Sequence, residues 1–164
     1  AALARSPRVD GIAFTGSTET ARLIRAAMAA HLAPTAPLIA ETGGLNAMLV
    51  DSTALPEQAV RDVIASSFQS AGQRCSALRG LYLQDDVSGH IEAMLLAAMD
   101  ELSLGNPWDL ATDVGPVIDA AAQADIVAYV EAARAEGRVV KSLASPVSPR
   151  ARCCASSSHP ASAP

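Results

Sequence analysis

The strongest constraint on the fold of this chain is an alternation of short apolar runs with amphipathic segments. The apolar runs occupy residues 9–15, 38–40, 47–50 and 78–83. Segments 18–32, 56–68 and 87–102 carry apolar side chains at helical spacing,. Asp119 and Gly137 bracket a fourth helix, as its N-cap and its terminator,. Strands that alternate with helices indicate an α/β layer architecture.

Composition and charge narrow the class of protein. The chain has 164 residues, of which 50% are hydrophobic, so it can bury a core of ordinary domain size,. Its net charge of −5 argues against a phosphate-binding surface, and we expect no nucleic-acid partner,. No apolar run reaches the roughly 18–20 residues of a membrane span, and no signal peptide is visible. Three cysteines without scaffold spacing favour reduced thiols and a cytoplasmic location,.

Cys75 is the first candidate catalytic residue. It follows Gly72, Gln73 and Arg74 in a polar segment just after a predicted helix. A thiol attacks a carbonyl as its thiolate, so a catalytic cysteine has to be accessible. A polar turn provides that access. The alternative interpretation is a half-buried structural cysteine.

Glu41 is the second candidate. It follows the apolar run 37–40 and precedes Gly43 and Gly44. A carboxylate in this place can serve as a general base, and glycines allow a ligand or backbone to approach closely. The alternative is a solvated acid at a strand end.

A strand-to-helix turn at Gly16 and Ser17 is a third candidate. The first amides of a helix can bind a phosphate group, although many helices begin this way without a ligand. The complete dinucleotide fingerprint is absent. The cluster Cys153, Cys154 and His159 lacks a second ligand pair, so we predict no metal site,.

Taken together, these motifs resemble the aldehyde dehydrogenase superfamily. The resemblance rests on residues 14–19 (Phe-Thr-Gly-Ser-Thr-Glu), 41–46 (Glu-Thr-Gly-Gly-Leu-Asn) and 72–75 (Gly-Gln-Arg-Cys), in the family's order. Segments 105–107 and 115–118 extend it downstream. Within the superfamily the chain looks most like the glutamate-semialdehyde (1-pyrroline-5-carboxylate) dehydrogenase domain of the bifunctional proline utilisation A proteins. The resemblance covers about residues 9–140.

The resemblance implies both an activity and roles for particular residues. Cys75 would attack an aldehyde, hydride would pass to NAD, and Glu41 would activate the water that hydrolyses the resulting thioester. The backbone N–H of Cys75 would supply half of an oxyanion hole. Gly16 and Ser17 would contact the cofactor pyrophosphate, and Ser76 would help to hold the substrate carboxylate. NAD and NADP are not distinguished, because the residues that contact the adenosine ribose lie outside the matching motifs.

The resemblance also implies a division of the chain. Residues 1–44 would be the end of a Rossmann-like NAD-binding domain, and 45–140 the start of the α/β catalytic domain. Residues 141–164, rich in serine and proline, would form a disordered tail from a shifted reading frame,. The chain is about a third of a family member in length, so we expect a fragment that is inactive alone, from a parent enzyme that forms homo-oligomers.

Two other functions stay open at this point. One is a non-catalytic remnant or interaction module. The other is acylating chemistry with coenzyme A, which Glu41 argues against because a water-activating base favours hydrolysis.

Overall fold

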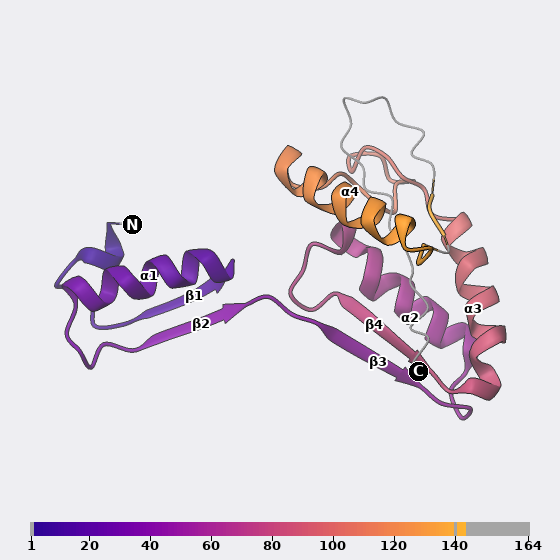
Figure 1. Cartoon of the computed structure of the whole chain (residues 1–164), viewed down its shortest axis with the longest axis horizontal. Coiled ribbons are helices and arrows are strands. Elements are labelled where there is room, and N and C mark those ends of the chain that lie inside the picture. The colour runs from indigo at the N-terminus through magenta and orange to yellow at the C-terminus, as the bar shows by residue number, and fades with distance from the viewer. Residues whose placement is uncertain (1, 140, 144–164) are drawn as a thin grey trace. The chain divides into compact units, whose positions relative to one another are not determined.

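The computed structural model describes residues 2–139 and 141–143. The chain divides into two compact units, Ala1–Gly44 and Leu45–Pro164 (Figure 1). Each unit contains one pair of parallel strands.

The first unit is a strand–helix–strand element. A short 3-10 turn, η1 (Leu3–Arg5), precedes β1 (Ile12–Gly16), α1 (Thr18–His31) and β2 (Leu38–Thr42). Strands β1 and β2 pair in parallel, with Ile12 opposite Leu38 and Gly16 opposite Thr42. A helix is the usual connection between parallel neighbours, because the chain must return to the same end of the sheet.

Local signals set the start of α1. Ser17 is the N-cap, and its Oγ accepts a hydrogen bond of 3.1 Å from the Thr20 amide. This bond satisfies one of the amides that the first turn of a helix leaves without an intrahelical partner.

The second unit repeats the strand–helix–strand order and adds two helices. Its elements are β3 (Asn46–Val50), α2 (Pro56–Phe68), η2 (Gln69–Gly72), β4 (Leu78–Leu83), α3 (Asp85–Asp100) and α4 (Ala120–Ala135). Strands β3 and β4 are parallel, and their register shifts between Asn46 and Ala47. Asp119 caps α4, because its Oδ1 accepts from the Ala122 amide at 2.8 Å.

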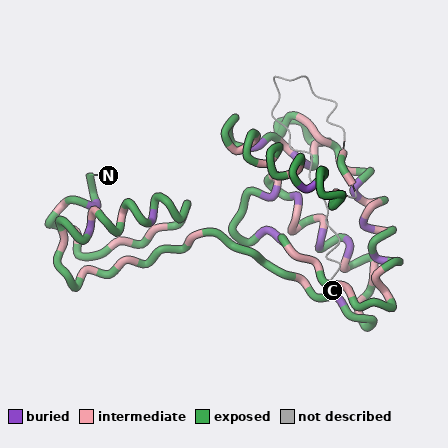
Figure 2. Tube along the Cα trace, viewed as in Figure 1, coloured by how far each residue is buried: buried purple, intermediate pink, exposed green. Residues whose placement is uncertain are grey.

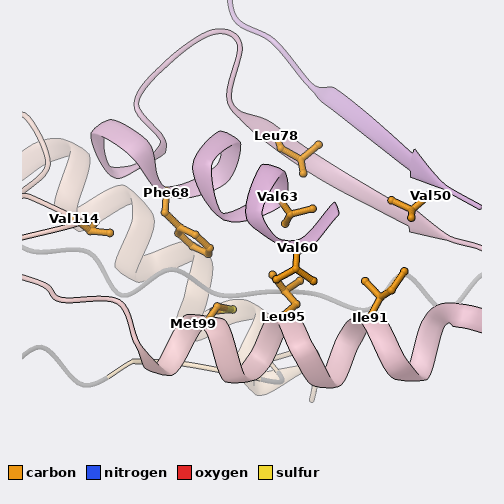
Figure 3. Close-up of a cluster of buried hydrophobic side chains, with 9 residues drawn as sticks. All are labelled: Val50, Val60, Val63, Phe68, Leu78, Ile91, Leu95, Met99 and Val114. Carbon is orange, nitrogen blue, oxygen red and sulfur yellow. The ribbon is translucent and has the colours of Figure 1, made fainter. Parts of the chain in front are cut away.

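The main core lies in the second unit, and buried positions recur along α2 and α3 (Figure 2). Side chains of α2 point toward those of α3, and strand side chains join them (Figure 3). The cluster consists of Val50, Val60, Val63, Phe68, Leu78, Ile91, Leu95, Met99 and Val114. Burial of such side chains contributes about 1.5–3 kcal/mol each.

The turn between β3 and α2 is closed by a carboxylate. Asp51 Oδ1 accepts from the Thr53 hydroxyl at 2.6 Å and from the Thr53 amide at 2.9 Å. These two hydrogen bonds hold the pKa of Asp51 below its usual value of 3.8, and the Thr53 hydroxyl has a larger effect than the Thr53 amide. This turn therefore loses stability as the pH falls through the lowered pKa.

Most elements agree with the sequence predictions. The strand over 78–83 and the helices over 56–68 and near 87–102 are confirmed, as are the caps Ser17 and Asp119. Two burial predictions are wrong. The helical spacing of segment 18–32 puts Leu23 on its apolar face, and the ring of Trp108 is expected to pack, but both side chains are exposed. Both side chains lack a covering element among the described residues.

The predicted tail, 141–164, lies mostly outside the described residues. Of the part that is described, Lys141 Nζ forms an ion pair of 2.5 Å with Asp100 Oδ1 at the end of α3. Contact with the folded unit therefore extends past the predicted boundary.

We expect Leu95→Ala to lower the free energy of unfolding by about 2–5 kcal/mol, because it leaves a cavity in the core. Leu49→Ala is the matched control, since Leu49 is 80% exposed and Leu95 only 7%. The control should cost less than about 1 kcal/mol. Urea unfolding followed by circular dichroism measures both losses, and equal losses would contradict this assignment of the core.

Candidate active site

Cys75 sits at the centre of a tight turn before β4. The Ala77 amide donates to the Arg74 carbonyl at 3.1 Å, so Cys75 and Ser76 are the two central residues of the turn. Both are exposed, and Cys75 is not in a disulfide. The structural-cysteine interpretation required partial burial and is wrong.

The two ends of the segment that carries Cys75 are buried. Phe68, the last residue of α2, is 8% exposed, and Ala77 is completely buried. Between them, every residue is exposed except the half-buried Ala71 and the buried Gly72. The loop is thus short and fixed at both ends to the main core.

Backbone conformation makes the first half of this loop unusual. Ser70, Ala71 and Gly72 are three successive residues with positive φ, at 56°, 53° and 67°. For a residue with a Cβ, this region costs about 1–2 kcal/mol. Such strain persists only where the surroundings enforce it.

Gln73 supplies part of that enforcement. Its Nε2 donates to the Ser70 carbonyl at 3.0 Å and to the Pro116 carbonyl at 3.4 Å. Its Oε1 accepts from the Ile118 amide at 2.7 Å. One side chain therefore joins the loop of Cys75 to the segment that precedes α4.

Arg79 and Asn46 hold the loop from the sheet side. Arg79 is the extra residue of β4 at the register shift, and its Nη2 donates to the Gly72 carbonyl at 2.5 Å. Asn46 Nδ2 donates to the carbonyls of Cys75, at 2.6 Å, and Ala77, at 3.0 Å. A bulge redirects side chains in this way.

Glu41 lies at the other predicted part of the site, in the first unit. It is the fourth residue of β2 and is exposed. In the parallel register Thr15 lies opposite Glu41, and Gly16 opposite Thr42. Glu41, Gly16 and Ser17 therefore meet at the carboxyl edge of the β1–β2 pair, where ligands bind in open α/β sheets.

The structure thus brings the predicted site residues together in two groups. Cys75 and Ser76 share a turn of the second unit, and Glu41, Gly16 and Ser17 share a sheet edge of the first. Sequence reasoning did not single out the side chains of Asn46, Gln73 and Arg79. Gln73 and Arg79 lie close to Cys75 in the sequence, and Asn46 closes the motif 41–46, but their hydrogen bonds depend on the fold.

A groove in the first unit contains none of the predicted site residues. It has a volume of about 700 Å³ and runs between α1 and β2, with Arg22, Arg25 and Met28 among its walls. Its lining carries no cysteine, histidine or carboxylate, so size alone does not mark it as a reaction site.

The described residues, 2–139 and 141–143, contain neither a candidate metal site nor a candidate membrane span. In that part of the chain no group of three His, Cys, Asp or Glu side chains could hold a metal ion. The cluster of Cys153, Cys154 and His159 lies outside it. No helix within the same residues is long and apolar enough to cross a bilayer.

Residues 1–148 match the Aldehyde dehydrogenase family, so the chain belongs to this family. The sequence motifs predicted a resemblance that ends near residue 140, and the family match continues to residue 148. The fold is accordingly part of an aldehyde dehydrogenase fold.

Within the family, the chain is similar to the Bifunctional protein PutA of Klebsiella aerogenes, with 57% identity over 143 residues. That match covers 85% of this chain but 11% of the relative, so the chain spans about a tenth of the relative's length. It is also 35% identical to 1-pyrroline-5-carboxylate dehydrogenase of Geobacillus kaustophilus, covering 82% of this chain and 27% of that relative.

The chain is also similar to solved structures of PutA and of betaine aldehyde dehydrogenase. A Bradyrhizobium japonicum proline utilization A (PutA) mutant matches with 47% identity and a TM-score of 0.82, over 95% of this chain and 16% of that one. Betaine aldehyde dehydrogenase of Staphylococcus aureus in complex with NAD+ matches with 29% identity and a TM-score of 0.78, over 86% and 28% of the two chains.

We expect Gly72→Ala to destabilise the second unit more than Gly137→Ala. Both glycines have positive φ, at 67° and 69°, so both substitutions add about 1–2 kcal/mol of backbone strain,. A Cβ at Gly72 would also lie 2.8 Å from the Ser67 carbonyl oxygen, whereas one at Gly137 would meet nothing within 4 Å. The extra loss at Gly72 should be about 1–3 kcal/mol in urea unfolding. Equal losses would show that the loop before Cys75 yields to a side chain.

Proposed function

We propose that this chain provides the nucleophile and base segments of an NAD-dependent aldehyde dehydrogenase. The enzyme would oxidise L-glutamate γ-semialdehyde to glutamate in proline catabolism. The observation that carries the proposal is the exposed Cys75 thiol on a turn held at both ends. The substrate is suggested by the relatives named bifunctional PutA and 1-pyrroline-5-carboxylate dehydrogenase.

In the proposed reaction, Cys75 Sγ attacks the aldehyde carbon as a thiolate and forms a thiohemiacetal. The negative charge that develops on the former carbonyl oxygen is stabilised by the backbone N–H of Cys75. The carbon then loses a hydride, with its two electrons, and becomes a thioester of Cys75.

The proposed cofactor accepts that hydride when it is bound. Gly16 and Ser17 fit its pyrophosphate, because they open the fourteen-residue helix α1 at the carboxyl edge of parallel strands. Amides at a helix N-terminus favour phosphate oxygens. The relative that was solved with NAD+ supports the same cofactor here.

Glu41 would complete the cycle by taking a proton from the water that attacks the thioester. This attack releases the carboxylate product and regenerates the thiol. Glu41 is exposed on β2, and the chain turns away through Gly43, whose φ of +68° glycine adopts without strain,. Ser76, beside Cys75 in the same turn, would hold the substrate carboxylate.

The division of labour between the units is part of the proposal. The first unit, 1–44, would contribute to cofactor binding, and residues 45–140 to catalysis. We place the enzyme in the cytoplasm and expect the parent enzyme to be a homo-oligomer.

A second candidate is a non-catalytic remnant or interaction module. It is favoured by exposed apolar side chains at Leu45, Trp108 and Leu110. Exposed apolar surface marks interaction or aggregation sites. Under this alternative the thiol and the carboxylate are present but unused.

The two candidates separate in a graft experiment. Residues 2–139 replace the matching segment of Klebsiella aerogenes PutA, and NADH formation from L-glutamate γ-semialdehyde is followed by absorbance. We expect turnover from the graft and a loss of at least about a thousandfold with Cys75→Ala, because the nucleophile is gone.

Glu41→Gln in the same graft tests the base. We expect a burst of about one NADH per site followed by turnover slowed about 10²–10⁴-fold, because the thioester forms but is not hydrolysed. Asp51→Asn, a surface carboxylate of a turn, is the matched control and should leave turnover unchanged. A folded graft without turnover, or turnover that survives Cys75→Ala, would support the remnant.

A further inference from the structure

The side chain of Asn46 has a geometry that the proposed chemistry does not yet use. It is the first residue of β3 and lies five positions after Glu41. Its Nδ2 carries two hydrogens, and the two acceptors are the carbonyls of Cys75, at 2.6 Å, and Ala77, at 3.0 Å. Both donors of the amide are therefore directed at the turn that holds the thiol.

These two carbonyls fix the orientation of the turn. A held carbonyl of Cys75 fixes the peptide plane between Cys75 and Ser76, and a planar peptide leaves only two soft dihedrals per residue. The Ala77 carbonyl belongs to the residue whose amide closes the turn on Arg74. Asn46 thus constrains the turn on both sides of the exposed thiol.

The register of the sheet places Asn46 there. Asn46 pairs with Leu78, and Ala47 with Gly80, so β4 has one extra residue, Arg79, at this point. The ladder of backbone hydrogen bonds is interrupted beside the turn. There the Asn46 side-chain amide donates to carbonyls that precede β4. Sequence separations of 29 and 31 residues show that no local turn preference explains these bonds.

We infer that Asn46 is a positioning residue for Cys75. It holds the backbone on both sides of the nucleophile and ties that turn to the strand that begins just after the segment of Glu41. The inference rests on the proposed function, in which Cys75 attacks the aldehyde, and it adds a residue that acts through the nucleophile without touching the substrate.

The first test uses the 164-residue chain and amide hydrogen exchange at Ala77, whose N–H closes the turn. Asn46→Asp keeps the shape of the side chain but loses both donors and sets a carboxylate against two carbonyl oxygens. We expect exchange at Ala77 to accelerate about tenfold or more, as for the loss of two ordinary hydrogen bonds. Asn46→Ser, a shorter side chain with one donor, should give a smaller acceleration.

Asn106→Asp is the matched control. Asn106 uses its Oδ1 to accept from the Trp108 amide at 3.1 Å, and a carboxylate preserves that acceptor. In this control, the exchange rate at Ala77 should stay within about twofold of that in the unchanged chain. In every variant that keeps its core, the exchange rates at Leu95 and Met99 should also stay within about twofold. In both Asn46 variants, exchange at Ala77 could instead accelerate only as much as exchange at Leu95 and Met99. That result would mean that Asn46 stabilises the whole unit and does not position the turn, and it would overturn the inference.

The second test measures kinetics in the grafted PutA. We expect Asn46→Asp to lower kcat about 10–100-fold while KM for the aldehyde changes less than about threefold, because a displaced nucleophile reacts slowly without altering substrate binding. An unchanged kcat would overturn the inference while leaving the proposed function intact. An inactive graft with unaltered Asn46 would instead count against the proposed function, and the exchange result would still decide whether Asn46 holds the turn.

Discussion

The structure of the candidate site depends on the burial of two small stretches that flank the loop of Cys75. Phe68 closes α2 inside the main core, and Ala77 with Leu78 opens β4 inside the same core. Because the core fixes both ends, the chain between them is forced through three residues with positive φ before it reaches the thiol. Packing energy of α2 against α3 and β4 thus offsets the backbone strain of the loop, and hydrogen bonds from Asn46, Gln73 and Arg79 select one path through it.

A common feature of both units is that the candidate site residues lie at or beside strand ends. The first unit places Glu41 and the Gly16–Ser17 turn at the carboxyl edge of a parallel pair. The second places Cys75 before the amino end of β4, beside the start of β3. The strands supply rigid positions, and the short connections supply the polar groups, so that the candidate side chains are exposed while their backbone is held.

Local signals in the sequence were enough to predict most of the secondary structure. Ser17 and Asp119 are good caps wherever they occur before a helical pattern, and Gly137 adopts positive φ just after α4,. The exposure of Leu23 and Trp108 was not predictable in this way, since it depends on which elements cover them. The support of Cys75 by Asn46 also escaped prediction, because it arises from a register shift in the sheet and joins residues 29 positions apart.

In this structure a fixed turn presents an exposed thiol. The most direct measurement is the ¹⁵N order parameter of the Cys75 and Ser76 amides in the 164-residue chain. We expect values near those of α2 and α3, about 0.85, because both ends of the loop are buried and its carbonyls are held. Values below about 0.6 at Cys75 and Ser76, with α2 and α3 still rigid, would show a mobile loop and would contradict the account.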